Sequence, residues 1–296
     1  MNKINQKDTQ STLRVTRPVK LLEFLCESFP DRSRKSVKAL LEQKQIMIAS
    51  QIVTWFNYQL EPGMDVMVLK KKASQNTTLR KMNLIYEDEH LMVIEKSAGL
   101  LSVASEKETG ETAFSILKSH VKKFSNDAQL YVVHRLDRDT SGVMMFAKDK
   151  AIQQKLQDNW DAVVTKRIYY AVVEGHVHKA EGKIVSTLKE NKSLKMYSSG
   201  TAENGQKAVT RYRVLKSNAR YSLLEVALET GRKNQIRVHL QDIGHSIAGD
   251  KKYGALTNPI RRLGLHAGIL EFFHPATGKR MHFETPVPAC FEILFG

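Results

Sequence analysis

The stretch His134–Gly142, with the sequence HRLDRDTSG, places an aspartate between two arginines. Arg135 and Arg138 lie within two residues of Asp137, and their charges favour the ionised carboxylate if the side chains point the same way. An ionised carboxylate is a competent covalent nucleophile. The same spacing also fits a surface ladder of Arg–Asp pairs, or a turn in which the aspartate bonds to nearby backbone. Asp137 is therefore a candidate catalytic group, with the structural alternative still open.

The ten histidines and two cysteines do not form a metal-binding pattern. Zinc sites combine His, Cys and carboxylate ligands at short, regular spacings, and no H-x-x-x-H pair occurs here. Cys26 and Cys290 lie near opposite ends of the chain, so we expect two buried apolar thiols and no disulfide. The sequence therefore predicts structural histidines and no metal.

Apolar runs on both sides of the aspartate-containing stretch predict strands at 132–133 and 143–147. Asp137 would then lie in a loop supported by a sheet, where catalytic groups are often found. Two further runs, rich in β-branched and apolar residues, predict strands at 168–173 and 223–228.

Helices are predicted between and after these strands. Asp149 can cap a helix that extends to Trp160, and the apolar spacing over 234–243 predicts another helix, which ends at Gly244. A hairpin at 84–94 precedes them. Because strands and helices do not alternate regularly, we expect an α+β fold rather than a doubly wound sheet.

The formal net charge is +15, from 46 Lys and Arg against 31 Asp and Glu. Such an excess is unfavourable self-repulsion unless an anionic partner relieves it, and nucleic acid is the first candidate. An anionic membrane is the second, but no run approaches the roughly 20 apolar residues that span a bilayer. The polar N-terminus also lacks the apolar core of a signal peptide. We therefore expect a cytoplasmic protein with no membrane partner.

The basic charge is concentrated near the N-terminus, where residues 1–80 contain 14 Lys and Arg against 7 Asp and Glu. The polar composition of segment 71–81 predicts a linker between a small α/β module at 1–70 and a larger domain at 82–296. In the module we expect a helix from Leu21, a second helix, and short strands that include 46–48 and 66–69.

The second helix of the module would be capped by Ser33 and would bury Val37, Leu40 and Leu41. Its other faces carry Arg34, Lys35 and Lys38. In a separate module ahead of an enzyme-like domain, a basic helix is typical of a nucleic-acid clamp, although a solvated face is the alternative. The pattern resembles the small S4-like RNA-binding module. That module usually has Gly and Asn-Gly near its first hairpin, where this chain has Lys44 and Ala49-Ser50.

The string HRLDRDTSG resembles the signature loop of the RluA family of pseudouridine synthases, in which the aspartate after Leu is the catalytic residue. Other segments resemble further motifs of this family in the expected order, over roughly residues 82–296. They are the first hairpin (84–100), a strand with a tyrosine (166–175), a third motif (230–239), Gly249-Asp250, Tyr253-Gly254, Leu265-His266-Ala267 and His274-Pro275.

This resemblance implies a mixed, mostly antiparallel β-sheet with flanking helices, the pseudouridine synthase fold. It also implies an isomerase that converts specific uridines in structured RNA to pseudouridine. The uracil–ribose bond at N1 breaks, the base turns over, and it rejoins through C5. All atoms stay in the product, so no cofactor is required. The target base must be flipped out of its stack, and contacts with the RNA backbone must supply the binding energy.

The resemblance also assigns roles to single residues. Asp137 is the catalytic carboxylate, and we favour attack on the sugar over attack on the base, which the sequence leaves open. Tyr169 would stack on the flipped uracil and help to move the proton at C5, with ordinary core packing as the alternative. Arg237 would pair with Asp137 and keep it charged, with a phosphate contact as the alternative. The residues expected to bind RNA are Arg135, Arg138, Arg232, Arg34, Lys35 and Lys38.

Three departures from the family pattern concern subfamily and loop geometry. Ser97 lies in the segment where Lys-Pro-Ala-Gly is usual, Asn234 stands where the third motif normally has His, and Ser246 replaces the common Pro after His245. None of them removes a group that the chemistry requires.

Two other functions fit parts of the sequence. One is a catalytically inactive RNA-binding ribosome-assembly factor of the same fold, against which the set of Asp137, Tyr169 and Arg237 argues. The other is a hydrolytic nucleoside glycosidase that uses a carboxylate and releases free uracil. The expected partner is RNA, with large-subunit (23S) ribosomal RNA first and transfer RNA second, and a monomer is expected.

Overall fold

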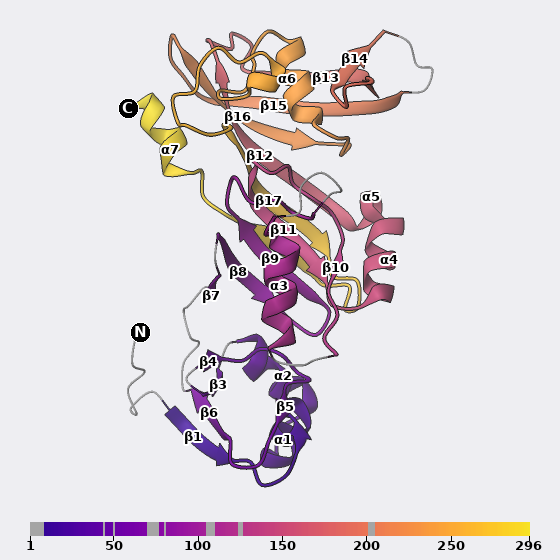
Figure 1. Cartoon of the computed structure of the whole chain (residues 1–296), viewed down its shortest axis with the longest axis vertical. Coiled ribbons are helices and arrows are strands. Elements are labelled where there is room, and N and C mark those ends of the chain that lie inside the picture. The colour runs from indigo at the N-terminus through magenta and orange to yellow at the C-terminus, as the bar shows by residue number, and fades with distance from the viewer. Residues whose placement is uncertain are drawn as a thin grey trace. The chain divides into compact units, whose positions relative to one another are not determined.

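The computed structural model describes residues 9–43, 45–49, 51–69, 77–79, 81–104, 110–123, 127–200 and 205–296 (Figure 1). The chain divides into two compact units. Unit 1 comprises 1–94, 114–133 and 145–153, and unit 2 comprises 95–113, 134–144 and 154–296. Strands β9 (Leu91–Lys96) and β11 (Ser141–Ala147) contribute residues to both units.

Unit 2 contains a mixed, mostly antiparallel sheet, as the resemblance implied. Its strands are antiparallel to their neighbours, except that β17 is parallel to β11 at Ser141–Gly142. In spatial order they are β14 (Met196–Ser199), β13 (Glu181–Glu190), β15 (Gln206–Ser217), β16 (Tyr221–Leu228), β12 (Val164–Glu174) and β17 (Leu265–Phe273), and β18 (Arg280–Glu284) also pairs with β17.

The helices of unit 2 cover both faces of this sheet (Figure 1). Successive side chains of a strand point to opposite faces, so Val173 of β12 packs with Ile236 of α6, whereas Val172 packs with Phe291 of α7. The helical segments of unit 2 are α5 (Trp160–Val163), α6 (Gln235–Asp242), η2 (Lys251–Tyr253), α7 (Ala289–Glu292) and η3 (Ile293–Phe295).

Gly142 is required where β11 meets β17. Its φ is +118°, and a Cβ atom here would lie 2.1 Å from the carbonyl oxygen of Ala267. Only glycine adopts this backbone conformation readily and also lets two strands approach so closely. The parallel pairing next to the predicted catalytic loop therefore depends on this one residue.

Unit 1 begins with the small α/β module. Its sheet has the order β1 (Thr9–Arg14), β6 (Asp65–Leu69), β3 (Ile46–Ile48) and β4 (Gln51–Ile52), and β2 (Val19–Lys20) pairs with β5 (Gln59–Leu60). Helices α1 (Leu21–Ser28) and α2 (Arg34–Glu42) bury their apolar faces. As predicted, the Ser33 hydroxyl caps α2 and accepts a hydrogen bond from the Ser36 amide at 3.2 Å.

The rest of unit 1 includes the predicted hairpin, formed by β8 and β9. Its turn is closed by Asp88, whose carboxylate accepts hydrogen bonds from the amides of His90 and Leu91, both at 2.7 Å. The elements here are β7 (Thr77–Leu79), β8 (Met82–Glu87), α3 (Ala113–Lys122), β10 (Tyr131–Val132) and α4 (Lys150–Asp158), some of which share residues with unit 2.

The helix capped by Asp149 ends at Asp158 instead of including Trp160, which begins the separate short helix α5. Strand β7 lies inside the predicted linker 71–81, most of which falls outside the described residues, as do Lys44 and Ser50. The proposed domain boundaries and the S4-like character of the module remain predictions.

Among the helices in the described ranges, none is long and apolar enough to cross a membrane.

A buried ion pair stabilises unit 1. The ammonium of Lys148 donates to Glu87 Oε1 at 3.0 Å and to the Asp88 carbonyl at 2.6 Å, and it lies 3.7 Å from the centre of the Trp55 ring. Glu87 also accepts a hydrogen bond from the Thr54 hydroxyl at 3.0 Å. Both charged side chains are about 5% exposed or less. Removing one partner would leave the other charge buried without compensation.

We therefore expect Lys148→Met to lower the free energy of unfolding by about 3 kcal/mol, because Glu87 would remain buried without its partner. The double variant Lys148→Met, Glu87→Met should recover much of the loss. Urea unfolding of the two variants, with exposed Lys150→Met as the matched control, measures this. Equal stability of the Lys148 and Lys150 variants would contradict the role of the pair.

Candidate active site

The predicted catalytic loop joins β10 to β11, as the sequence indicated. Its backbone is fixed by Ser102, whose hydroxyl donates to the Leu136 carbonyl at 2.7 Å and accepts from the Leu136 amide at 3.2 Å. The Thr140 amide donates to the Asp137 carbonyl at 3.2 Å and closes a turn. The backbone N–H and C=O groups of Leu136, the residue before Asp137, are therefore both hydrogen-bonded.

Lys96 ties the other side of the loop to a neighbouring turn. Its fully buried side chain donates to the carbonyl oxygens of Leu100 (2.7 Å), Arg138 (2.9 Å) and Ser97 (3.0 Å). Burial lowers the pKa of Lys96 to about 8, although the carboxylates of Asp139 and Asp137 act in the opposite direction. Burying the Lys96 ammonium costs free energy, so Lys96 stabilises the loop through its three hydrogen bonds and not through its charge alone.

The arginine that contacts Asp137 comes from helix α6. Arg237 Nη1 donates to Asp137 Oδ2 at 3.0 Å. The same guanidinium makes a two-pronged contact with Asp250, from Nε at 2.7 Å and from Nη2 at 2.8 Å. The side chain of Asp250 is 1% exposed, so this contact is deeply buried. Asp250 therefore orients Arg237, and Arg237 orients Asp137.

The charge of Arg237 is secured by these carboxylates. Burial alone would lower its pKa, but the hydrogen bonds and charges of Asp250 and Asp137 raise it above the ordinary value. The face of the guanidinium lies 4.8 Å from the Tyr253 ring centre. Asp137 is about one-third exposed, and its Oδ1 has no hydrogen-bond partner within the described part of the chain. One carboxylate oxygen is thus anchored while the other is available.

Tyr169 lies on β12, where it pairs with Val226 of β16 and Ala267 of β17. Its half-buried side chain reaches the same cleft as Asp137. Burial raises the pKa of Tyr169 to about 12; Arg167 opposes this shift and Asp137 adds to it. The phenol is therefore protonated at neutral pH.

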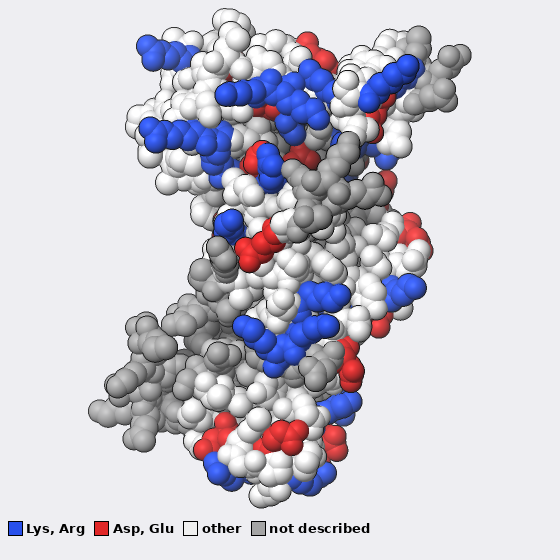
Figure 2. All heavy atoms as spheres, viewed as in Figure 1, with Lys and Arg blue, Asp and Glu red and all other residues white. Residues whose placement is uncertain are grey.

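These side chains line one cleft of unit 2, with a volume of about 470 Å³. That volume accommodates a nucleotide-sized ligand. In Figure 2, Lys and Arg side chains gather over the region of unit 2 that contains α6 and the neighbouring strands. The lining residues are Arg135, Leu136, Asp137, Thr140, Tyr169, Leu228, Gly231, Arg232, Lys233, Asn234, Gln235, Ile236, Arg237 and Leu265.

Comparison with known proteins agrees with this geometry. Residues 90–242 match the family described as RNA pseudouridylate synthase. The chain is 32% identical over 273 residues to an uncharacterized RNA pseudouridine synthase of Bacillus subtilis, covering 90% of this chain and 89% of that one. It is 30% identical over 289 residues to the ribosomal large subunit pseudouridine synthase D of Pseudomonas aeruginosa, covering 92% and 89%.

A solved structure gives the same result. The human RNA pseudouridylate synthase domain containing 4 superposes with a TM-score of 0.58 at 25% identity, over 71% of this chain and 90% of that one. The chain belongs to the RNA pseudouridine synthase family. It is an isomerase that acts on RNA, and the RluA-type resemblance of its sequence is confirmed.

The three predicted catalytic residues of this pseudouridine synthase meet in the cleft, and two of the predicted RNA-binding residues, Arg135 and Arg232, line it. Arg138 does not line the cleft, and its Nε lies 3.4 Å from Asp139 Oδ1. Asp137 accepts its hydrogen bond from the distant Arg237, although Arg135 and Arg138 lie beside it in the sequence.

The basic residues of α2 differ from one another. Arg34 and Lys35 are exposed, whereas Lys38 donates to Glu89 Oε2 at 2.5 Å and lies 5.3 Å from the Phe56 ring centre. The hydrogen bond from Lys38 lowers the pKa of Glu89. Lys38 is therefore committed to an ion pair within unit 1.

Asn234 is accommodated where the family usually has His. It precedes α6 with a left-handed φ of 53°, a conformation that Asn tolerates better than most residues. Its side-chain oxygen accepts from Arg237 Nη1 at 3.3 Å, and its nitrogen donates to the Tyr253 hydroxyl at 3.0 Å. The amide thus contributes to holding Arg237.

No role was predicted for Lys96, Asp250 or Tyr253, although each lies in a segment that resembles the family. The sequence does contain a signal for Lys96, because a lysine in a strand of mostly apolar residues needs hydrogen-bond partners if it is buried. In the described ranges, no three His, Cys, Asp or Glu side chains are placed to hold a metal. His266 instead bonds to the hydroxyls of Ser141 and Thr285, and burial lowers its pKa to about 4.

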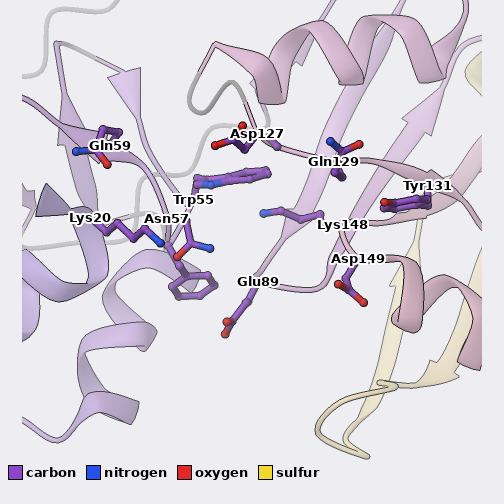
Figure 3. Close-up of a pocket in the computed structure, with 12 residues that line it drawn as sticks. Lys20, Trp55, Asn57, Gln59, Glu89, Asp127, Gln129, Tyr131, Lys148 and Asp149 are labelled. Atoms are coloured by element: carbon purple, nitrogen blue, oxygen red, sulfur yellow. The ribbon is translucent and has the colours of Figure 1, made fainter.

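Unit 1 contains a separate cleft of about 500 Å³ (Figure 3). Lys20, Trp55, Asn57 and Gln59 line one side of it, and Lys148 extends toward Trp55. Three carboxylates, those of Glu89, Asp127 and Asp149, line it together with only two lysines. This balance does not favour a polyanion, and the cleft holds none of the predicted site residues.

Lys96 leads to a prediction about pH. We expect the single-turnover rate to fall as the pH rises through about 8. A neutral amine has two N–H groups for three carbonyls, so the loop that holds Asp137 would loosen. The Lys96→Met variant should be slow at every pH and should lack this fall.

Stability should change in the opposite direction. The folded pKa of Lys96, about 8, is below the ordinary value of 10.5, so the unfolded chain binds more protons between these values. The free energy of unfolding therefore gains a contribution as the pH rises from about 8.

A single-turnover rate that stays constant as the pH rises through about 8 would contradict the role of Lys96 in the loop.

Proposed function

We propose that this pseudouridine synthase modifies uridines of large-subunit ribosomal RNA, with Asp137 as the catalytic carboxylate. The observation that carries the catalytic assignment is the asymmetric setting of Asp137. Arg237 binds Oδ2, Oδ1 is available, and Tyr169 lines the same cleft. The ribosomal substrate is supported by the Pseudomonas relative, whose name refers to the large ribosomal subunit and which aligns over most of both chains.

In the proposed reaction, a flipped uridine enters the cleft and Asp137 attacks C1′ of the ribose. The bond from C1′ to N1 breaks, and the uracil is released from the sugar while it stays in the cleft. After the base turns, a bond from C5 to C1′ forms and the carboxylate leaves. C5 loses a proton and N1 gains one, so the atoms balance without a cofactor. Arg237 orients the attacking carboxylate by donating to its Oδ2.

Tyr169 would contribute its ring and its hydroxyl. The flat ring can stack on the flipped uracil, as aromatic side chains do with unpaired bases. Because the pKa of about 12 keeps the phenol protonated, the hydroxyl can take the C5 proton only as it gives up its own. Tyr169 would therefore pass a proton on, instead of acting as a base that is already ionised.

RNA contacts outside the chemistry would come from two places. Arg135 and Arg232 line the cleft, and Arg34 and Lys35 are exposed on α2 of the N-terminal module. Lys38 would act indirectly, because its charge is paired with Glu89. Arg138 remains a candidate for a backbone contact. A ribosomal substrate also fits the predicted cytoplasmic location. The protein is also predicted to be a monomer.

We expect Asp137→Asn to lower the single-turnover rate of pseudouridine formation by at least about three orders of magnitude, because the amide cannot act as the nucleophile. RNA affinity should hardly change, since Asp250 still holds Arg237. Asp139→Asn removes the same charge from the same loop and is the matched control. A rate for Asp137→Asn within a few-fold of that control would exclude the catalytic role.

The substrate is tested by mapping pseudouridine in cells that lack the protein. We expect one or a few positions of large-subunit ribosomal RNA to lose the modification, and expression of the protein to restore it. Purified ribosomal RNA from these cells should accept the modification from the enzyme in vitro. Loss confined to transfer RNA would overturn the ribosomal assignment, and release of free uracil would indicate a glycosidase.

A further inference from the structure

Arg167 is a poorly compensated cation next to the cleft. It lies two residues before Tyr169 on β12, so both side chains point to the same face. Its side chain is only 12% exposed. Within the described residues its guanidinium makes one hydrogen bond, a long one of 3.4 Å to the Glu229 carbonyl. It also lies 4.0 Å from the well-exposed Asp161 carboxylate and 5.9 Å from the centre of the Trp160 ring, which is a weak contact at that distance.

These contacts leave most of its hydrogen-bonding capacity unused, because a guanidinium has five N–H donors. The carboxylate of Glu229 does not compensate the charge, since Arg211 and Lys183 already bind it. Burial lowers the pKa of Arg167 and Arg232 lowers it further, while Tyr169 and Asp161 act in the opposite direction. A desolvated charge with so few partners is costly and favours the binding of an anion.

Gly231 connects this cation to the cleft. It lines the cleft, and a Cβ atom on it would lie 2.6 Å from Arg167 Nη1. The guanidinium therefore packs directly against the backbone at Gly231. The next residue, Arg232, is exposed and lines the cleft as well. Two arginines thus flank one glycine at the margin of the catalytic cleft.

We propose that Arg167 and Arg232 together bind one phosphodiester group of the RNA strand that delivers the uridine to the cleft. The two non-bridging oxygens of a phosphate match the planar fork of a guanidinium. Its negative charge would relieve the repulsion between the two arginines, which a neutral base carbonyl would do poorly. A flipped nucleotide leaves its phosphates outside the pocket that holds its base. The inference requires RNA as the substrate, but not ribosomal RNA or catalysis by Asp137.

The test measures binding of the full chain to a labelled single-stranded heptauridylate over a range of KCl concentrations. Each phosphate neutralised on a single strand contributes about 0.7 to the slope of log K against log salt. We expect Arg167→Gln to reduce this slope by about that amount and to weaken binding several-fold at low salt. Arg213→Gln, which removes the same charge from an exposed residue paired with Glu225, is the matched control and should leave the slope unchanged.

A second variant keeps every charge and moves only the guanidinium. Gly231→Ala should weaken binding, because the new methyl group would occupy the space of Arg167 Nη1. In the Arg167→Gln background it should have no further effect. Thermal unfolding of each variant checks that the fold is retained.

Two results would overturn the proposal. One is an equal slope for wild type, Arg167→Gln and Arg213→Gln. The other is full additivity of Gly231→Ala and Arg167→Gln, which would mean that the methyl group acts on the RNA directly. Both readouts are binding measurements, so a failure of the ribosomal or catalytic assignment would not affect them.

Discussion

The contact of Arg237 with two carboxylates is the constraint on which the rest of the site depends. Asp250, nearly inaccessible to solvent, accepts from Nε and Nη2 on one edge of the guanidinium, and Asp137 accepts from Nη1. A single buried cation facing two anions stays charged and has little freedom to rotate. The proposed catalytic carboxylate therefore takes its orientation from helix α6 and from the residue that caps the 3-10 helix η2, both far from it in the sequence.

The loop that carries Asp137 is fixed by polar groups instead of by regular structure. Ser102 satisfies the backbone of Leu136, and Lys96 collects three carbonyl oxygens, one of them from the residue after Asp137. Burying an ammonium is costly, but carbonyls that would otherwise lack donors offset part of this cost. The same hydrogen bonds connect the loop to the turn at Ser97–Leu100, so the position of Asp137 depends on a lysine that makes no hydrogen bond to it.

The basic charge of the chain serves more than one purpose. Lys38 and Lys148 form ion pairs within unit 1, and Lys148 is buried against Trp55. The cleft, by contrast, is lined by Arg135 and Arg232 together with a single carboxylate, that of Asp137. Cations whose counter-ions are missing from the protein are the ones that an RNA backbone can satisfy. The net charge of +15 therefore does not by itself indicate where RNA would bind, because some of the cations are already paired within the protein.

Local features could be predicted from the sequence: the Ser33 and Asp149 caps, the turn at Asp88 and the order of the family motifs, from which the proposed roles of Asp137 and Tyr169 followed. These depend on residues close in the chain, and short-range propensity is enough. It did not predict β13 and β15, because strands with one solvent face alternate polar and apolar residues and lack long apolar runs. The groups that hold Asp137 could be identified only from the folded chain. Asp250 and Lys96 act through contacts between distant segments, which no local pattern records.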